Sequence, residues 1–171
     1  AGSAWLALAA AGRAQGRPRT RLVLLGTAGG PTPKVQSSAP AQAIVVGDRI
    51  YLVDCGDGVA RQLALAQLPI RQLRNIFITH QHSDHAGGLR AVVAEGIPIL
   101  THQVNKPFYE KMLRNPATIE PDKLANNPRA PMIEGVTDKK VITDGTKTIE
   151  VHHVRGNLHD EGLLMVYFPK E

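Results

Sequence analysis

Cysteine, aromatic residues and long apolar runs are all scarce in this chain of 171 residues. The single cysteine, Cys55, excludes an internal disulfide, so the disulfide-stabilised small folds are ruled out. Aromatic residues make up only 4% of the chain, which is too few for a platform on which nucleic-acid bases stack. The apolar run at residues 5–11 is far shorter than the ~20 residues of a membrane-spanning helix.

The overall composition is that of one globular domain, with 43% hydrophobic and 20% charged residues. The formal charge of +5 is a mild excess, and four arginines within residues 13–21 supply much of it. We interpret that segment as a solvated stretch rather than a nucleic-acid surface. We therefore expect a small-molecule substrate and no nucleic-acid partner, and the sequence leaves the oligomeric state open.

The N-terminal segment is the only indication of localisation. Residues 5–11 followed by the small residues Gly12 and Ala14 resemble the apolar part and cleavage site of a secretory signal peptide. Residues 1–14 would then be a partial signal peptide, and the protein would work in the periplasm or outside the cell. The alternative is an alanine-rich leader without that function, which leaves the protein in the cytoplasm.

Strand-like and helix-like segments alternate along the rest of the chain, which predicts a layered α/β domain. A tight turn at Gly47 and Asp48 joins two of the predicted strands in a hairpin. Residues 115–131 hold four prolines and are expected to be irregular. The expected strands are 22–26, 41–47, 49–53, 75–78, 97–101, 140–143, 148–154 and 163–168, and the expected helices are 59–66, 86–94 and 105–113.

The most informative feature is a cluster of potential metal ligands directly after the predicted strand at 75–78. The ligand-type side chains His80, His82, Asp84 and His85 fall within six residues, on what we expect to be a loop before a helix. Imidazoles with a carboxylate are the ligands that zinc prefers, with iron or manganese as alternatives. His80 and His82 can converge on one ion, whereas Asp84 and His85 point elsewhere and suit a second ion.

The pattern His-x-His-x-Asp-His followed by Gly-Gly resembles the signature of the metallo-β-lactamase superfamily. The resemblance implies a four-layer αβ/βα sandwich over residues 21–171. It also implies a first metal ion held by His80, His82 and the later His159, and a second held by Asp84 and His85. Two further ligands of the second ion in the family, a bridging Asp and a last His, cannot be placed before residue 171. We therefore expect the sandwich to be incomplete at its C-terminus.

Three features outside the cluster bear on the same site. Asp54 stands in the position of the family's Asp-x-Gly motif, which implies hydrogen bonds that orient the metal-binding imidazoles. His102, His152 and His153 lie in or near predicted strands, and we interpret each as a structural or surface histidine. His159 is preferred as the third ligand because it lies in a loop before a strand, as in the family.

The expected activity is that of a metal-dependent hydrolase, in which zinc lowers the pKa of bound water from 15.7 to about 7. Asp84 would act in catalysis by orienting the resulting hydroxide. The candidate substrates are esters, amides, phosphoesters and sulfate esters. The opening residues 24–31 resemble RNase Z-like and arylsulfatase-like members of the superfamily, which makes an RNase Z-like phosphodiesterase the first alternative. The others are iron-dependent oxygen chemistry and a metal-binding domain without turnover.

Overall fold

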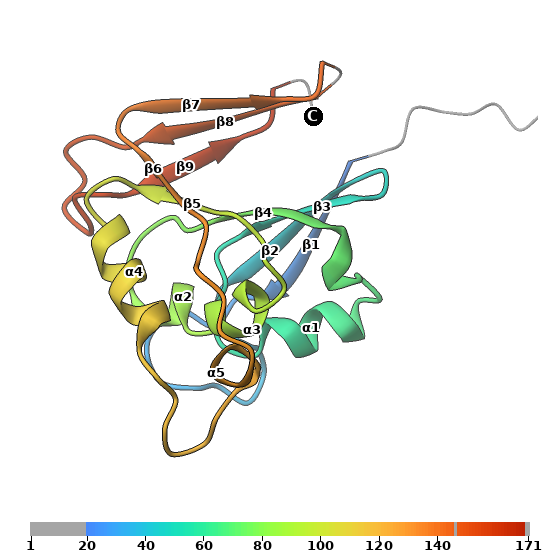
Figure 1. Cartoon of the computed structure of the whole chain (residues 1–171). Coiled ribbons are helices and arrows are strands. Elements are labelled where there is room, and N and C mark those ends of the chain that lie inside the picture. The colour runs from blue at the N-terminus through green and yellow to red at the C-terminus, as the bar shows by residue number, and fades with distance from the viewer. Residues whose placement is uncertain (1–19, 146, 170–171) are drawn as a thin grey trace, which may run out of the picture.

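Two stacked sheets with helices on one side make up the described part of the chain, residues 20–145 and 147–169 of the computed structural model (Figure 1). The larger sheet has six strands in the order in which they occur in the sequence: β1 (Arg21–Gly26), β2 (Ala41–Val46), β3 (Arg49–Val53), β4 (Leu73–Phe77), β5 (Ile99–His102) and β6 (Ile133–Val136). The smaller sheet contains β7 (Lys139–Thr143), β8 (Thr148–His153) and β9 (Leu164–Tyr167). The strands β1 to β3 pair antiparallel, and β3 to β6 pair parallel.

The helices cover the face of the larger sheet that points away from the smaller sheet (Figure 1). They are α1 (Val59–Leu65), α2 (Ser83–Ala86), α3 (Leu89–Val93), α4 (Lys106–Arg114) and α5 (Lys123–Asn126), with a 3-10 turn at Ile70–Gln72. The main apolar core lies between these helices and the larger sheet, and a second core lies between the sheets. None of the described helices combines the length and apolar character needed to cross a bilayer.

This arrangement confirms the predicted α/β fold. Helix layer, larger sheet and smaller sheet correspond to three of the four layers in the expected αβ/βα sandwich. Within residues 20–145 and 147–169, no helix lies over the outer face of the smaller sheet, where Met165 and Tyr167 are half exposed (Figure 1). The predicted signal segment at residues 1–14 lies outside the described residues.

The predicted helix at residues 86–94 is wrong in its boundaries. The chain instead forms α2 and α3, with Gly87 and Gly88 between them, and α2 includes Asp84 and His85, which we had expected in a loop. The break occurs because the Gly88 amide donates to the Cys55 carbonyl at 2.8 Å instead of to a helical carbonyl. A glycine is required there, since a Cβ atom on Gly88 would lie 2.4 Å from the Gly56 carbonyl oxygen.

Besides the short 3-10 turn, one helix and one strand were not predicted from the sequence. The short helix α5 lies inside the segment expected to be irregular, and the Asp122 side chain caps it by accepting from the Ala125 amide at 2.8 Å. The strand β6 contains Gly135, a poor strand former, and pairs in parallel with β5. Both elements also have partners that are distant in the sequence, since β6 pairs with β5 and Asp122 binds the Arg90 guanidinium.

Candidate metal centre

The site forms where two neighbouring parallel strands end. Asp54 follows β3 and Thr79 follows β4, so the parallel pairing brings both residues to the same edge of the sheet. The Asp54 amide donates to the Phe77 carbonyl at 2.8 Å, and the Thr79 amide donates to Oδ1 of Asp54 at 2.9 Å. Asp54 has a φ of 58°, which is in the left-handed region, and its side chain is buried. The edge is therefore built around one buried carboxylate.

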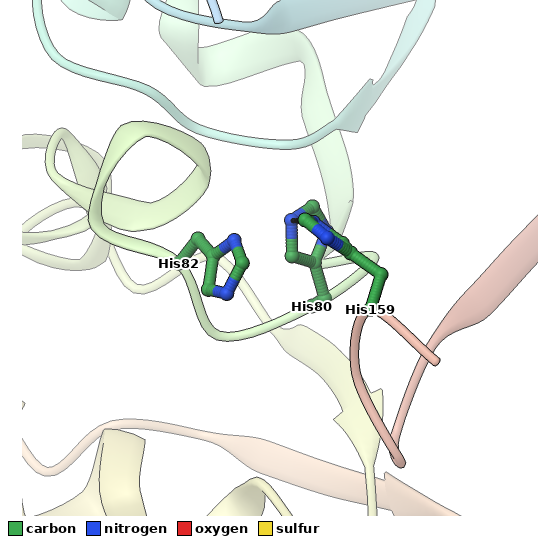
Figure 2. Close-up of side chains that lie close together, drawn as sticks. All are labelled: His80, His82 and His159. Atoms are coloured by element: carbon green, nitrogen blue, oxygen red, sulfur yellow. Dashed lines mark hydrogen bonds between the residues drawn. The ribbon is translucent and has the colours of Figure 1, made fainter. Parts of the chain in front are cut away.

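Three histidines converge beside this carboxylate. His80 and His82 come from the loop after β4, and His159 comes from the loop between β8 and β9, so that the rings gather from two separate segments (Figure 2). One ring nitrogen from each residue lies within 4.8 Å of the others. His80 is buried, whereas His82 and His159 are exposed at the mouth of the site. The structure thus brings together the three residues that the sequence nominated for a first metal ion.

The spacing of two of these donors matches a tetrahedral ion. Two nitrogens bound to zinc at 2.0–2.1 Å with tetrahedral geometry are roughly 3.3 Å apart. Nε2 of His80 and Nε2 of His159 lie 3.2 Å apart. Burial, reinforced by the charge of His85, lowers the pKa of His80, which favours the neutral imidazole that a metal ligand requires.

Asp84 and His85 lie on α2 next to the three histidines. Oδ2 of Asp84 is 3.6 Å from Nε2 of His85 and accepts a hydrogen bond from the Gly30 amide at 2.7 Å. Burial raises the pKa of Asp84, but the Gly30 hydrogen bond and the His85 charge outweigh it, so the pKa lies below its ordinary value. The ring centroids of His80 and His85 are 4.0 Å apart, which places this second pair against the first group.

The Asp54 carboxylate contacts the second group directly and is linked to the first through Thr79. Its Oδ2 accepts from Nδ1 of His85 at 2.7 Å, and the Thr79 hydroxyl lies 2.9 and 3.0 Å from its two oxygens. Burial lowers the pKa of His85, but the hydrogen bond and charge of Asp54 outweigh it and raise the pKa above its ordinary value. The same Thr79 hydroxyl is 2.9 Å from Nδ1 of His80. The sequence analysis did not identify Thr79, although it directly precedes the first histidine of the motif.

The loop that carries His159 is held by Asp160, a second residue that sequence reasoning missed. Asp160 is buried and accepts hydrogen bonds from the Gly162 amide at 2.7 Å, from Nδ2 of Asn105 at 3.3 Å and from the Gln81 amide at 3.4 Å. The last of these donors lies between the first two histidines of the motif. Asp160 therefore joins the loop of His159 to the loop of His80 and His82. No local sequence signal marks it, because its partners are 55 and 79 residues away in two cases.

Four of the five metal-ligand candidates, His82, Asp84, His85 and His159, line an open pocket of about 520 Å³, together with Gly29, Gly30, Pro31 and Ser83. A second pocket of about 500 Å³ shares Gly30, Pro31, Ser83 and Asp84 with it. The two pockets adjoin along the loop after β1, so a groove leads away from the histidines. Lys34, Asp57 and Arg61 also line this second pocket.

The remaining strand histidines have structural partners, as predicted. His102 is buried, and its Nε2 lies 3.2 Å from the Thr137 carbonyl, while its ring packs on that of His153. Nε2 of His153 contacts the Glu161 carbonyl, and Nε2 of His152 contacts Glu150, both at 2.8 Å. None of the three belongs to the histidine cluster that the described residues form.

A three-histidine centre at the strand ends of a layered α/β sandwich is typical of a metalloprotein. Comparison with a family model identifies the family. The model of the metallo-beta-lactamase superfamily matches residues 40–165. The chain belongs to the metallo-beta-lactamase superfamily, a family of metallo-hydrolases.

Curated relatives are similar over part of their length. The chain is 47% identical over 74 residues to a ribonuclease Z of Pseudomonas putida, covering 43% of this chain and 23% of the relative. It is 41% identical over 73 residues to a ribonuclease Z of Archaeoglobus fulgidus, covering 43% of this chain and 24% of the relative. The matched segment thus spans about a quarter of the length of these relatives.

Solved structures share the fold. The human tRNase Z, short form, superposes with a TM-score of 0.57 at 20% identity, over 78% of this chain and 60% of that chain. The metallo-beta-lactamase fold protein YhfI of Bacillus subtilis gives a TM-score of 0.61 at 19% identity, over 86% and 56%. At this identity the likeness shows the fold alone. The curated relatives are named ribonuclease Z, which agrees with the first alternative activity and not with the expected absence of a nucleic-acid partner.

Proposed function

We propose that the protein is a metal-dependent hydrolase in which His80, His82 and His159 hold a first ion, and Asp84 and His85 hold a second. The observation that carries the proposal is the 3.2 Å approach of the Nε2 atoms of His80 and His159, from segments 79 residues apart. Zinc is the ion we propose, because three imidazoles with a nearby carboxylate match its preferred donors. Iron and manganese accept the same donor types, and metal analysis distinguishes them.

An ion held there would supply a Lewis acid, able to lower the pKa of water to about 7 and to polarise the bond under attack. The protein supplies orientation and a proton acceptor. Asp84 faces the pocket with a lowered pKa, so it stays a carboxylate at neutral pH and accepts a hydrogen bond from the attacking water. The Gly30 amide fixes the direction in which this carboxylate points.

We infer that the substrate is a phosphodiester, with RNA as the first class to test. Two observations support this choice. The curated relatives are named ribonuclease Z. Lys34 and Arg61 line the groove that leads from the histidines, where they can bind phosphates on one side of the bond that is cleaved. Amides, carboxylic esters and sulfate esters are the competing substrates.

The test combines metal content with hydrolysis. Elemental analysis of purified protein should give about one zinc or more per chain, and His82→Ala should remove metal. Hydrolysis of bis(p-nitrophenyl) phosphate and of an RNA transcript should fall by more than ~100-fold in this variant. We expect the loss of a metal ligand to reduce activity more than the loss of an outer hydrogen-bond partner does, which costs 10–100-fold. His152→Ala is the matched control, because that imidazole contacts Glu150 on the smaller sheet.

The metal-dependent activity and the RNA substrate can be refuted separately. A folded wild-type protein without bound metal, or full hydrolysis after chelation and in His82→Ala, would refute the metal-dependent hydrolase. Metal-dependent hydrolysis of a p-nitrophenyl ester or sulfate without any phosphodiester cleavage would keep the hydrolase and refute the RNA substrate.

A further inference from the structure

The hydrogen bonds around Thr79 determine the direction in which its hydroxyl donates its proton. An ionised carboxylate only accepts hydrogen bonds, and a threonine hydroxyl has one proton to donate. The Thr79 hydroxyl lies 2.9 Å and 3.0 Å from the two oxygens of the buried Asp54. The Thr79 amide also donates to Asp54 at 2.9 Å, which holds the threonine in this position. The hydroxyl proton therefore points to Asp54.

The consequence for His80 follows from proton counting. Nδ1 of His80 lies 2.9 Å from the same hydroxyl oxygen, whose proton is already used. The hydrogen bond at that distance must then be donated by the imidazole, which places the proton of the neutral ring on Nδ1. Nε2 is left with a free lone pair, and it is Nε2 that lies 3.2 Å from Nε2 of His159.

We propose that Thr79 is a positioning residue. Its hydroxyl links the Asp54 carboxylate to His80 and holds the His80 ring in the tautomer that is protonated on Nδ1, so that Nε2 is free to bind a metal ion. The inference rests on the proposed function for the identity of the bound ligand, a metal ion. Asp54 then orients two imidazoles by two routes. It contacts Nδ1 of His85 directly at 2.7 Å and reaches Nδ1 of His80 through the threonine hydroxyl. One carboxylate thereby couples the first group of ligands to the second.

The backbone around Thr79 supports a fixed geometry. Its carbonyl accepts from the Leu164 amide at 2.8 Å, which attaches the start of β9 to the end of β4. The His80 carbonyl accepts from the buried Tyr109 hydroxyl at 3.0 Å. Because the carbonyls of Thr79 and His80 are both hydrogen-bonded, the backbone here is fixed. The Thr79 hydroxyl is then the group that determines which nitrogen of the His80 ring carries the proton.

The decisive variant is Thr79→Val, which keeps the branched shape and removes only the hydroxyl. Thr79→Ser restores the hydroxyl, and Thr118→Val is the matched control at an exposed position. The first readout is the histidine tautomer in metal-free protein near pH 8, from nitrogen-15 NMR. We expect the Nδ1–H form of His80 in wild type and Thr79→Ser, and a mixture of both forms in Thr79→Val.

The second readout is the zinc dissociation constant, measured by competition with a chromophoric chelator. We expect it to rise about 10–100-fold in Thr79→Val, as for other outer partners of metal-bound histidines, and less than about threefold in Thr79→Ser and Thr118→Val. An Nε2–H form of His80 in the wild type would overturn the inference whether or not Thr79→Val folds. So would an unchanged zinc affinity in a folded Thr79→Val protein.

These outcomes separate the inference from the proposed function. If the wild type binds no zinc or other divalent metal, the proposed function fails, while the NMR result still decides the tautomer. If the wild type binds zinc and Thr79→Val binds it equally well, only the role of Thr79 fails.

Discussion

Replacing Gly88 by alanine tests the close packing behind the metal-binding loop. A Cβ atom on Gly88 would lie 2.4 Å from the Gly56 carbonyl oxygen, 2.8 Å from Cγ1 of Val59 and 3.1 Å from the Cys55 carbonyl oxygen. Ordinary contacts between carbon atoms are at least roughly 3.5 Å, so relief of the Val59 contact alone needs a shift of about 0.7 Å. Little of the surroundings can move, since Val59 is buried and the Gly88 amide is bonded to Cys55.

The expected cost follows from this geometry. Overpacking of a close-packed interior costs about 1–3 kcal/mol, and two rigid carbonyl contacts put Gly88→Ala in the upper half of that range. For a domain of this size, each kcal/mol corresponds to roughly 2–4 °C in Tm. We therefore expect a loss of about 2–3 kcal/mol in the free energy of unfolding and a decrease in Tm of about 4–12 °C.

Gly29→Ala is the control for the same substitution. A Cβ atom there meets no atom within 4 Å, and Gly29 is not among the residues with positive φ. It should leave the free energy of unfolding unchanged or raise it by up to about 1 kcal/mol, because alanine restricts the unfolded chain. Thermal unfolding of both metal-free variants by circular dichroism decides the matter. A Gly88→Ala protein that melts at or above the wild-type temperature would refute the packing argument.

Two further substitutions test electrostatic contacts. Asp160→Asn replaces an acceptor of backbone amides with a partial donor, so the loop of His159 loosens, and zinc affinity should fall about tenfold in chelator competition. The exposed neighbour substitution Glu161→Gln should not change it, and equal affinities in all three proteins would contradict the role of Asp160. The Arg90 guanidinium, 2.5 and 2.9 Å from the Asp122 carboxylate, lowers the pKa of Asp122 to about 2. This stabilisation is complete above the ordinary pKa of 3.8 and is lost as pH falls toward 2. After allowance for solvent exposure, Asp122→Asn should cost about 1 kcal/mol in urea unfolding at pH 7 and much less near pH 2, whereas equal costs would be inconsistent with the ion pair.

The arrangement of the site explains why substitutions outside the ligand set should matter. Asp54, Thr79 and Asp160 contact no ion in the proposed centre, yet each fixes a residue or loop that does. Asp54 and Thr79 set the direction of two imidazole rings, and Asp160 sets the distance between the two histidine-bearing loops. Metal affinity in such a centre depends on ligands that are oriented before the ion binds.

Hydrophobic periodicity predicted most of the secondary structure. The strand expected at residues 41–47 forms as β2, and the turn at Gly47, with a φ of 62°, joins it to β3 as expected. Prediction failed where a distant backbone group competes with local preference. The helix expected at residues 86–94 breaks because the Gly88 amide bonds to Cys55, a residue from the end of another strand.

The sequence alone predicted the chemistry of the centre, because four of its five candidate ligands lie within six residues of one another. Spacing is sufficient to place His80 and His82 on one loop. Tertiary structure decided which other groups complete the site. The Gly30 amide reaches Asp84 across 54 residues, and Thr79 meets Asp54 across 25, since the parallel pairing of β3 and β4 brings their ends together. These partners are ordinary polar residues whose role depends on a hydrogen bond made across the fold, and such a bond leaves no periodicity or spacing in the sequence.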